Sequence, residues 1–527
     1  MNSRIVPFYF RHKAICIGLI ALVMGVILEF IAILSLNSGH FVYTLDDAYV
    51  HLALAENIRA GHYGINADEF SAPSSSILWP FILATFAGRK FGEFFPFFIN
   101  LMSAIGTLFL FHRILGRSIL IESAGTKSTI IVLSLIFLIL GTNIIGLIFT
   151  GMEHSLQLLF VAAIIWGLIL EIETRKVVSW LPFALVMAPL IRYENLALCL
   201  AALLYLLFRR YYKLSIILTI IIVLSLGAFT IFLMNLGLPP LPASILLKST
   251  PISSGGNAAT LWSNFKNNLG DPSGILLAVG MLFMISFALL SGRKREERLL
   301  AGSVSLAIIM HLLVGRFGWY NRYEIYIWAG TILVMLYLGR HLLSESLGNR
   351  AVLKFAIIGA LWTAIICAPY VKGLTTIRLA SNNIYEQQYQ MHRFAADYYK
   401  KPVAVNDIGY ISYRNDNFVL DLWGLASREA QNLKKNNENS EWMNELCQSH
   451  NVRLAMIYEK WFKKVPANWH KLGELHLGRR KITPADSVVS LFALNDDDCE
   501  QLYALLKTFK TTLPHGVALN LTEEDTR

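Results

Sequence analysis

The chain has 527 residues, of which 55% are hydrophobic and only 16% are charged. Soluble proteins carry about 25% charged residues, so this composition excludes an ordinary soluble enzyme and indicates a protein whose solvent is the lipid bilayer. The formal net charge is +10, yet residues 372–527 contain 20 Lys and Arg against 19 Asp and Glu. The positive charge therefore belongs to the apolar half, where it reports membrane topology and not nucleic-acid binding.

The apolar half, residues 1–371, is predicted to cross the membrane about eleven times. The first apolar run is too long for a signal-peptide core and lacks a small-residue cleavage site, so we expect it to stay as a span. Residues 77–88 are too short to span and are interpreted as a re-entrant or juxtamembrane segment. The candidate spans are 14–36, 94–112, 128–149, 154–171, 177–191, 193–208, 213–236, 273–291, 299–314, 324–340 and 351–370.

Basic loops give the predicted orientation. If residues 77–88 do not span, the loops "ETRK", "RRYYK" and "GRKREER" share the side of the N-terminus, which the positive-inside rule assigns to the cytoplasm. The first loop, 38–93, and the soluble domain, 372–527, then lie outside. The same outer side collects the polar clusters "YTLDDAYVH", "TGMEH", "IRYEN" and "GRFGWYNRYE", whereas the spans are almost free of charge. These clusters predict a site at the external membrane face.

Two adjacent carboxylates, Asp46 and Asp47, open a helix that the pattern predicts over residues 46–60. One interpretation is structural, with Thr44 as the N-cap and Asp47 as a first-turn acid that the helix dipole favours. That interpretation leaves Asp46 unexplained. In the other, a partly desolvated Asp46 carboxylate at the rim of a cavity accepts a hydroxyl proton. Both interpretations stay open for Asp47.

Charged residues also interrupt the membrane half. Arg192 and Glu194 break an apolar run from 177 to 208, where a charge is costly unless it is paired or faces water. Glu153 follows a glycine turn, where it is either a helix-start residue or a site residue. Lys248 follows a proline-stiffened loop, from which it could reach a phosphate at headgroup depth or only extend toward water.

The cluster "GRFGWYNRYE" mixes charges with aromatic rings between two spans. It is either an interfacial aromatic belt or a cationic and aromatic wall for an anionic ligand that carries a ring. Its candidate residues are Arg316, Tyr320, Arg322, Tyr323 and Glu324.

Residues 372–527 are predicted to form an α/β domain. The runs "PVAVND", "FVLDLWG", "VRLAMIY" and "VVSLFAL" are typical of strands and alternate with helical stretches. Asp407 follows the first of these strands, either as an acceptor-binding residue or as a turn aspartate. Cys447 and Cys499 could form a disulfide if the domain lies outside the cytoplasm.

Five segments, spread over about residues 40–425, resemble the GT-C class of polytopic glycosyltransferases, most closely the branch of the mycobacterial terminal arabinofuranosyltransferase. The sequence departs from the family pattern at Ser76 and Ile77, where Ser-Pro is common, and at Tyr193, where Pro is common, which leaves the substrate open. The five segments are "LDDAYVHLALAENIRAGHYGINADE", "APSSSILW", "TGMEHSLQL", "IRYENLAL" and "VAVNDIGYISYRNDNFVLDLWGL".

The resemblance implies a GT-C-like fold in a bacterial cytoplasmic membrane, with about eleven transmembrane helices and an extracytoplasmic α/β domain. It also implies inverting transfer of a sugar from a polyprenyl-phosphate donor to a cell-envelope glycan or glycolipid. An aspartate of the first outer loop is the expected general base, and Asp46 matches that position best. Arg192, Lys248, Arg316 and Arg322 are candidates to hold the donor phosphate. A divalent cation at the site is one alternative that the resemblance leaves open.

Two other classes compete with a transferase. A transporter with an outer sensing domain would carry charges near mid-membrane and two repeated halves, and the sequence contains neither. A non-catalytic receptor or assembly subunit would keep the topology without needing Asp46. The sequence has no Walker loop, dinucleotide glycine pattern or zinc spacing, so a soluble nucleotide is not expected as the donor.

Overall fold

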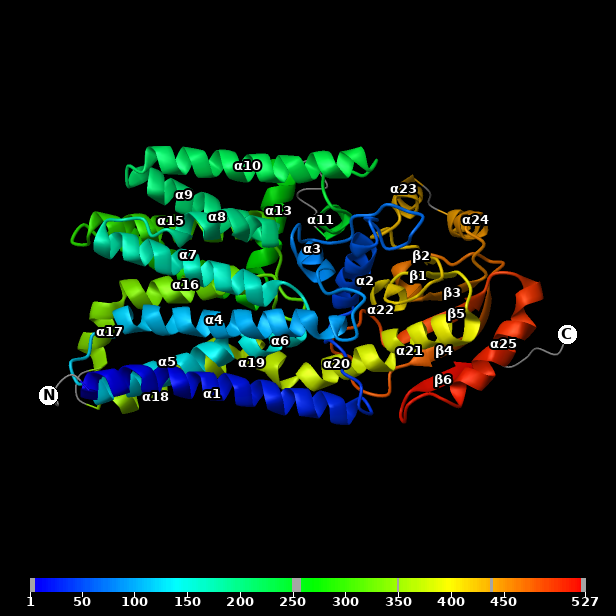
Figure 1. Ribbon diagram of the computed structural model, residues 1–527, viewed down its shortest axis with the longest axis horizontal. Helices are drawn as coiled ribbons and strands as arrows, with labels where there is room; N and C mark the ends of the chain where they lie inside the picture. The colour runs from blue at the N-terminus through cyan, green and yellow to red at the C-terminus, as the bar shows by residue number, and fades with distance from the viewer. Residues whose placement is uncertain (1–4, 249–256, 348–349, 437–438, 523–527) are drawn as a thin grey trace. The chain divides into compact units, whose positions relative to one another are not determined.

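The computed structural model describes residues 5–248, 257–347, 350–436 and 439–522, and its chain divides into two compact units (Figure 1). We call Met1–Leu28, Pro96–Phe229 and Lys248–Thr375 the helical unit, and Glu29–Phe95, Thr230–Leu247 and Thr376–Arg527 the sheet unit. The predicted first loop, 38–93, therefore packs as part of the sheet unit. The predicted boundary between residues 371 and 372 falls close to the division after Thr375.

The helices that lie wholly or mostly in the helical unit are α1 (Ile5–Leu36), α4 (Phe95–Ser118), α5 (Ala124–Gly141), α6 (Ile144–Phe149), α7 (His154–Thr174), α8 (Trp180–Ile191), α9 (Leu196–Phe208), α10 (Tyr212–Asn235), α13 (Ala258–Leu269), α14 (Pro272–Leu289), α15 (Arg295–Val314), α16 (Ile325–Leu338), α17 (Arg340–Leu347), α18 (Ala351–Leu361) and α19 (Ala368–Thr375). Within this unit α15 packs against α9, α14 and α16, and α7 packs against α8 and α16.

The helical unit contains several helices that could cross a membrane. Among the described residues, seven are long and apolar enough, or eight if the bent pair α18 and α19 is one span. The shorter apolar helices Trp180–Ile191, Tyr193–Phe208 and Ile325–Leu338 fall on the other predicted ranges, so the count of eleven stays a prediction. Helix α3 (Trp79–Ala84) is only about 9 Å long at 1.5 Å per residue, which agrees with the interpretation that residues 77–88 do not span.

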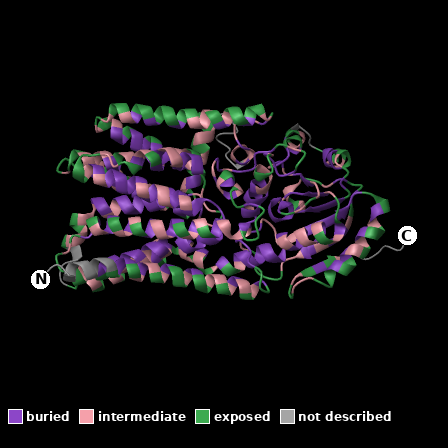
Figure 2. Ribbon diagram, in the orientation of Figure 1, coloured by how far each residue is buried: buried purple, intermediate pink, exposed green. Residues whose placement is uncertain are grey.

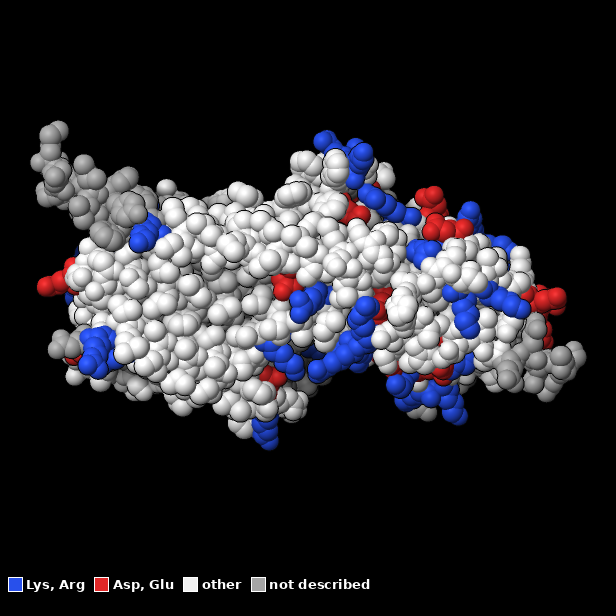
Figure 3. Space-filling model, turned by 90° about the horizontal axis from the view of Figure 1, so that it is seen from below, with Lys and Arg blue, Asp and Glu red and all other residues white. Residues whose placement is uncertain are grey.

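The surface of these helices is apolar where it is exposed. On α10, Ile216, Val223 and Leu224 are 54%, 61% and 66% exposed, and Figure 2 shows this helix as exposed along most of its length. On the face seen in Figure 3, most of the surface over the helices at the left carries no charged side chain. Such a surface is unfavourable in water and is favoured in hydrocarbon, as expected for a polytopic membrane protein.

The sheet unit is built on a six-stranded mixed sheet in the order β2-β1-β3-β5-β4-β6. Strands β2, β1 and β3 are parallel, and β5, β4 and β6 continue the sheet antiparallel. The carboxyl ends of the three parallel strands therefore meet at one edge, where loop residues are gathered. The strands are β1 (Val403–Val405), β2 (Val419–Asp421), β3 (Leu454–Ile457), β4 (His470–His476), β5 (Val488–Ala493) and β6 (Ala518–Leu521).

The predicted α/β domain is confirmed, and its four predicted strand runs correspond to β1, β2, β3 and β5. The disulfide that the sequence left open does not form, because Cys447 and Cys499 are both free and Cys447 belongs to the buried core of the sheet unit. The helices of the unit are α2 (Asp47–Arg59), α3, α11 (Ala243–Lys248), α20 (Ile377–Glu386), α21 (Gln388–Arg393), α22 (Gly409–Ser412), α23 (Arg428–Asn436), α24 (Glu441–Ser449) and α25 (Asp496–Lys510).

Candidate functional site

Asp46 joins the first loop to the α/β domain within the sheet unit. Helix α2 begins at Asp47, and the Asp46 side chain does not cap it. Instead Asp46 Oδ2 accepts the backbone N–H of Gly409 at 2.6 Å, and Oδ1 accepts that of Tyr410 at 2.8 Å. The interpretation of Thr44 as the N-cap is therefore wrong, because the helix starts three residues later. Asp46 is only 8% exposed, so its carboxylate is held away from bulk water.

A second carboxylate lies against Asp46. Asp407 follows β1, as predicted, and its side chain hydrogen-bonds to that of Asp46. Gln388 Nε2 donates to Asp407 Oδ2 at 2.8 Å, and the Tyr458 hydroxyl lies 3.3 Å from the same oxygen. Asp407 is half-buried and Asp47 is also half-buried. The structure thus brings the two aspartates of the first loop together with the aspartate of the α/β domain.

The two paired carboxyls have raised pKa values. Burial raises the pKa of Asp46 well above its usual range, and the negative charge of Asp407 raises it further, while the two backbone N–H groups act in the opposite direction. Burial also raises the pKa of Asp407, although its hydrogen bonds with Asp46 and Gln388 lower it. Two carboxylates in contact do not readily ionise together, so the pair keeps a proton to higher pH than an isolated aspartate does.

A glycine and a cluster of rings make this close approach possible. Gly409 has no side chain, and a Cβ added there would lie 2.5 Å from Asp46 Cγ. The rings of Tyr49 on α2 and Tyr410 on α22 pack with centroids 3.9 Å apart, and Tyr413 lies 5.8 Å from Tyr49. These contacts fix α22 against the start of α2, so the position of the Asp46 carboxylate is set by packing on both sides.

In the helical unit, three predicted residues form one buried ion-pair group. Arg192 Nη1 donates to Glu153 Oε1 at 2.6 Å, and Arg192 Nη2 donates to Glu194 Oε1 at 2.5 Å. Arg192 is 2% exposed and Glu153 is fully buried. The pairing satisfies the expectation that charges inside the apolar run need partners. Because the Arg192 guanidinium already binds two carboxylates, its predicted role in holding a donor phosphate stays a prediction.

The loop between α15 and α16 has an unusual backbone. Gly318, Trp319, Tyr320 and Asn321 have φ angles of 80°, 46°, 69° and 55°, four consecutive residues in the left-handed region. For a residue with a side chain this conformation costs about 1–2 kcal/mol, so the surrounding contacts must hold it. The Tyr320 hydroxyl donates to the Gly373 carbonyl at 2.8 Å. Strain of this kind is common where a loop presents side chains to a ligand.

The same loop places two further predicted residues beside Arg192. The guanidinium of buried Arg322 lies 5.1 Å from the centre of the Tyr323 ring, and that of Arg192 lies 6.0 Å from it. Arg316 is exposed. Glu324 is buried and its Oε2 accepts the Gly318 N–H at 3.1 Å. The side chain of Lys248, the remaining predicted donor-binding residue, lies outside the described residues.

The arrangement of the carboxylates does not provide a metal site. In the described part of the chain, no three His, Cys, Asp or Glu side chains are placed to hold an ion together. Asp46 already uses one lone pair of each oxygen to accept the N–H groups of Gly409 and Tyr410, which leaves it fewer for a cation. The donor set of Asp46, Asp47 and Asp407 therefore does not fit the cation that the resemblance leaves open.

Sequence reasoning missed several residues of this site. Tyr458 directly follows β3, and the rule that selected Asp407 after β1 could have selected it, because β1 and β3 are parallel neighbours. Gln388 carries no such signal, since it lies within a helical stretch. Gly409 and Tyr410 contribute backbone N–H groups, which every residue type except proline has.

Only part of this chain is similar in sequence to a known protein family. One family model, described as a domain of unknown function (DUF8728), matches residues 382–492. No curated protein matches the sequence.

Solved structures of an oligosaccharyltransferase of Archaeoglobus fulgidus are similar in part. The apo form is 10% identical with a TM-score of 0.44 and covers 94% of this chain and 76% of its own. The complex with Zn and sulfate is 12% identical with a TM-score of 0.45, at 94% and 74% coverage. An archaeal oligosaccharyltransferase of the same organism, in complex with an inhibitory peptide and a dolichol-phosphate, is 10% identical with a TM-score of 0.42, at 95% and 76%.

Similarity at these TM-scores and identities does not assign a fold family or an activity. The mycobacterial arabinofuranosyltransferase branch stays a prediction.

Proposed function

We propose that the protein is a GT-C-type membrane glycosyltransferase. It transfers a sugar from a polyprenyl-phosphate donor to a cell-envelope glycan or glycolipid, on the outer side of a bacterial cytoplasmic membrane. The observation that carries the proposal is the buried Asp46 carboxylate, which two backbone N–H groups orient and whose pKa is raised by burial and by Asp407. A carboxylate with a raised pKa is a stronger base, as proton abstraction near neutral pH requires.

In the proposed reaction Asp46 takes the proton from the acceptor hydroxyl. The acceptor oxygen attacks the anomeric carbon of the donor as the bond from that carbon to the phosphate oxygen breaks. The bonding electrons leave with the polyprenyl phosphate, and the single displacement inverts the anomeric centre. Each Asp46 oxygen has a second lone pair beside the one that accepts a backbone N–H, so the carboxylate keeps the capacity to receive a proton.

The leaving phosphate gains negative charge in the transition state, and a nearby cation lowers the barrier. In the helical unit Arg316 is exposed and Arg322 is held against Tyr323, which supports these two arginines for that role. Arg192 binds Glu153 and Glu194 and lies over the Tyr323 ring, so in this proposal it positions Tyr323 and does not itself bind the phosphate. No step uses a metal ion, because the carboxylates do not form a suitable ligand set.

One observation favours a second candidate, the non-catalytic receptor or assembly subunit. Both Asp46 oxygens bond to the backbone of α22, so Asp46 could serve only to join the first loop to the α/β domain. In that case the carboxylate is needed for stability and no sugar is transferred.

The test compares sugar transfer by wild type, Asp46→Asn and Asp47→Asn in reconstituted membranes. Asp416→Asn is the matched control, because Asp416 is an exposed aspartate of the same unit. We expect Asp46→Asn to lose transfer by about 10²-fold or more while donor binding is retained, and Asp416→Asn to match wild type. Transfer at the wild-type rate by folded Asp46→Asn would contradict the proposal. If Asp46→Asn unfolds, Asp46→Glu takes its place, because glutamate keeps the carboxylate but moves it by one methylene group.

A further inference from the structure

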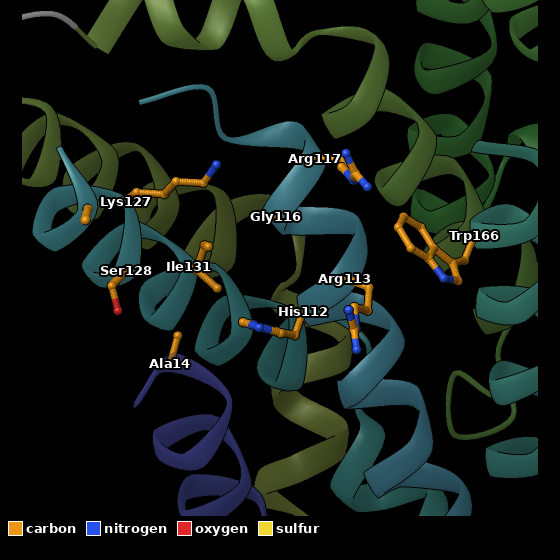
Figure 4. A pocket seen from close by; sticks show the side chains of 10 residues that line it. Ala14, His112, Arg113, Gly116, Arg117, Lys127, Ser128, Ile131 and Trp166 are labelled. Carbon is orange, nitrogen blue, oxygen red and sulfur yellow. The ribbon is translucent and has the colours of Figure 1, made fainter. Parts of the chain in front are cut away.

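The helical unit contains a cavity of about 400 Å³ that the proposed reaction does not use. It lies among α1, α4, α5 and α7, as Figure 4 shows from close by. Among the described residues, its lining includes no acidic residue and four basic ones, His112, Arg113 and Arg117 from α4 and Lys127 from α5. The cavity is large enough for a small charged group, since ligand sites in proteins measure about 300–1,000 Å³.

The positive charge of this cavity is only partly neutralised. Arg117 lies 3.5 Å from Glu173, but its side chain is 54% exposed, so that ion pair is weak. Within the described residues, neither Arg113 nor Lys127 forms an ion pair. Like charges that line one cavity repel each other, and an anion bound between them would remove this cost.

The cavity lies near one end of two candidate spans. Helix α4 ends at Ser118 and α5 begins at Ala124, and both helices are candidate spans. At 1.5 Å per residue, the basic groups lie within about 10 Å of these helix ends, and the ends of membrane spans lie near the lipid headgroups. Ile131 and Trp166 line the same cavity beside these basic groups and are largely apolar (Figure 4). The lining therefore offers both cations that can bind a phosphate and apolar side chains that can contact the first carbons of a lipid.

We propose that this cavity binds the phosphate of an anionic glycerophospholipid from the leaflet at the Ser118–Ala124 end of the helices. The guanidinium groups of Arg113 and Arg117 and the ammonium of Lys127 contact the phosphate oxygens, and Trp166 and Ile131 contact the first carbons of the lipid. Basic pockets between membrane helices recognise such headgroups, and the guanidinium fork fits two phosphate oxygens at once. Free phosphate shares this chemistry but has no use for the apolar wall.

The test measures lipid retention by the purified full chain with native mass spectrometry, using phosphatidylglycerol, phosphatidylcholine of the same chain length, and inorganic phosphate. Arg113→Gln/Lys127→Gln removes two cations from the cavity. Lys176→Gln/Lys213→Gln removes two exposed cations that do not line it and is the matched control. Gly116→Phe keeps the charge but fills the cavity, since a Cβ at Gly116 would meet no atom within 4 Å.

We expect wild type and the control to retain phosphatidylglycerol over phosphatidylcholine. The cavity double variant and Gly116→Phe should each bind phosphatidylglycerol about tenfold more weakly or worse, with phosphatidylcholine binding unchanged. Equal phosphatidylglycerol retention by the cavity variants and wild type would overturn the proposal. Loss of retention in the control would mean a general charge effect. Displacement of the lipid by inorganic phosphate would identify a free phosphate site instead.

Discussion

Replacing Gly409 by alanine should break the contact that orients Asp46. A Cβ at Gly409 would lie 2.5 Å from Asp46 Cγ and closer to the Asp46 carbonyl oxygen and Oδ2, whereas real Cβ contacts are essentially never under 3.0 Å. The carboxylate must therefore move by at least about half an ångström, which weakens its hydrogen bonds to Gly409 and Tyr410. Hydrogen bonds to a charged group contribute about 1.5–3 kcal/mol each. Alanine favours the helical backbone by about 1 kcal/mol, so we expect a net loss of about 2–4 kcal/mol.

The effect is measured by thermal unfolding in detergent and by the rate of sugar transfer. The expected loss lowers the unfolding temperature by about 5–10 °C, and a base displaced by up to 1 Å slows transfer on the order of 10²-fold. The control is Gly302→Ala on α15, where an added Cβ meets no atom within 4 Å and should not destabilise the chain. An unfolding temperature and a transfer rate equal to those of wild type in Gly409→Ala would refute the contact between Asp46 and α22.

Three further changes test other parts of the site. Asp407→Asn removes a negative charge that raises the pKa of Asp46, so the pKa of Asp46 should fall. Because the deprotonated base is the active form, the acid limb of the pH–rate profile should then move to lower pH. An unmoved limb would contradict the interaction between the two carboxyls. Arg192→Met leaves Glu153 and Glu194 buried without their cation and should cost about 3–5 kcal/mol of stability, measured by thermal unfolding; wild-type stability would contradict the buried ion pair. Addition of EDTA should leave the transfer rate unchanged, since no three His, Cys, Asp or Glu side chains among the described residues are placed around an ion. A rate that falls and recovers with added cation would show a metal site.

The sequence predicted those parts of the fold that depend on local patterns. The runs that became β1, β2, β3 and β5 are apolar and β-branched, because these strands have both faces buried in the domain. Strand β4 was missed because "HKLGELH" is half polar, with one face partly exposed and Gly473 at an irregular register. A strand of that composition does not stand out from a loop.

The site was predictable only in part, for a similar reason. Asp46 and Asp407 were selected separately, one at a helix start and one after a strand. The two residues are 361 positions apart in the sequence, and no local pattern encodes an interaction over such a separation. The two backbone N–H groups that orient Asp46 point at it because of the backbone conformation at the start of α22, which the residue types do not reveal. The pairing of Arg192 was foreseeable as a need for a partner, but the choice of both Glu153 and Glu194 depends on how α7 and α8 pack.

The most direct test of the proposed activity is product analysis after reconstitution of the wild-type protein with a panel of polyprenyl-phosphate sugars and glycan acceptors. We predict that one donor releases polyprenyl phosphate in equal amount to the sugar transferred, and that the new glycosidic bond has the opposite anomeric configuration, read by NMR. Retained configuration would contradict the single displacement with Asp46 as the base. Binding of a glycan without release of polyprenyl phosphate from any donor would instead identify a non-catalytic membrane subunit.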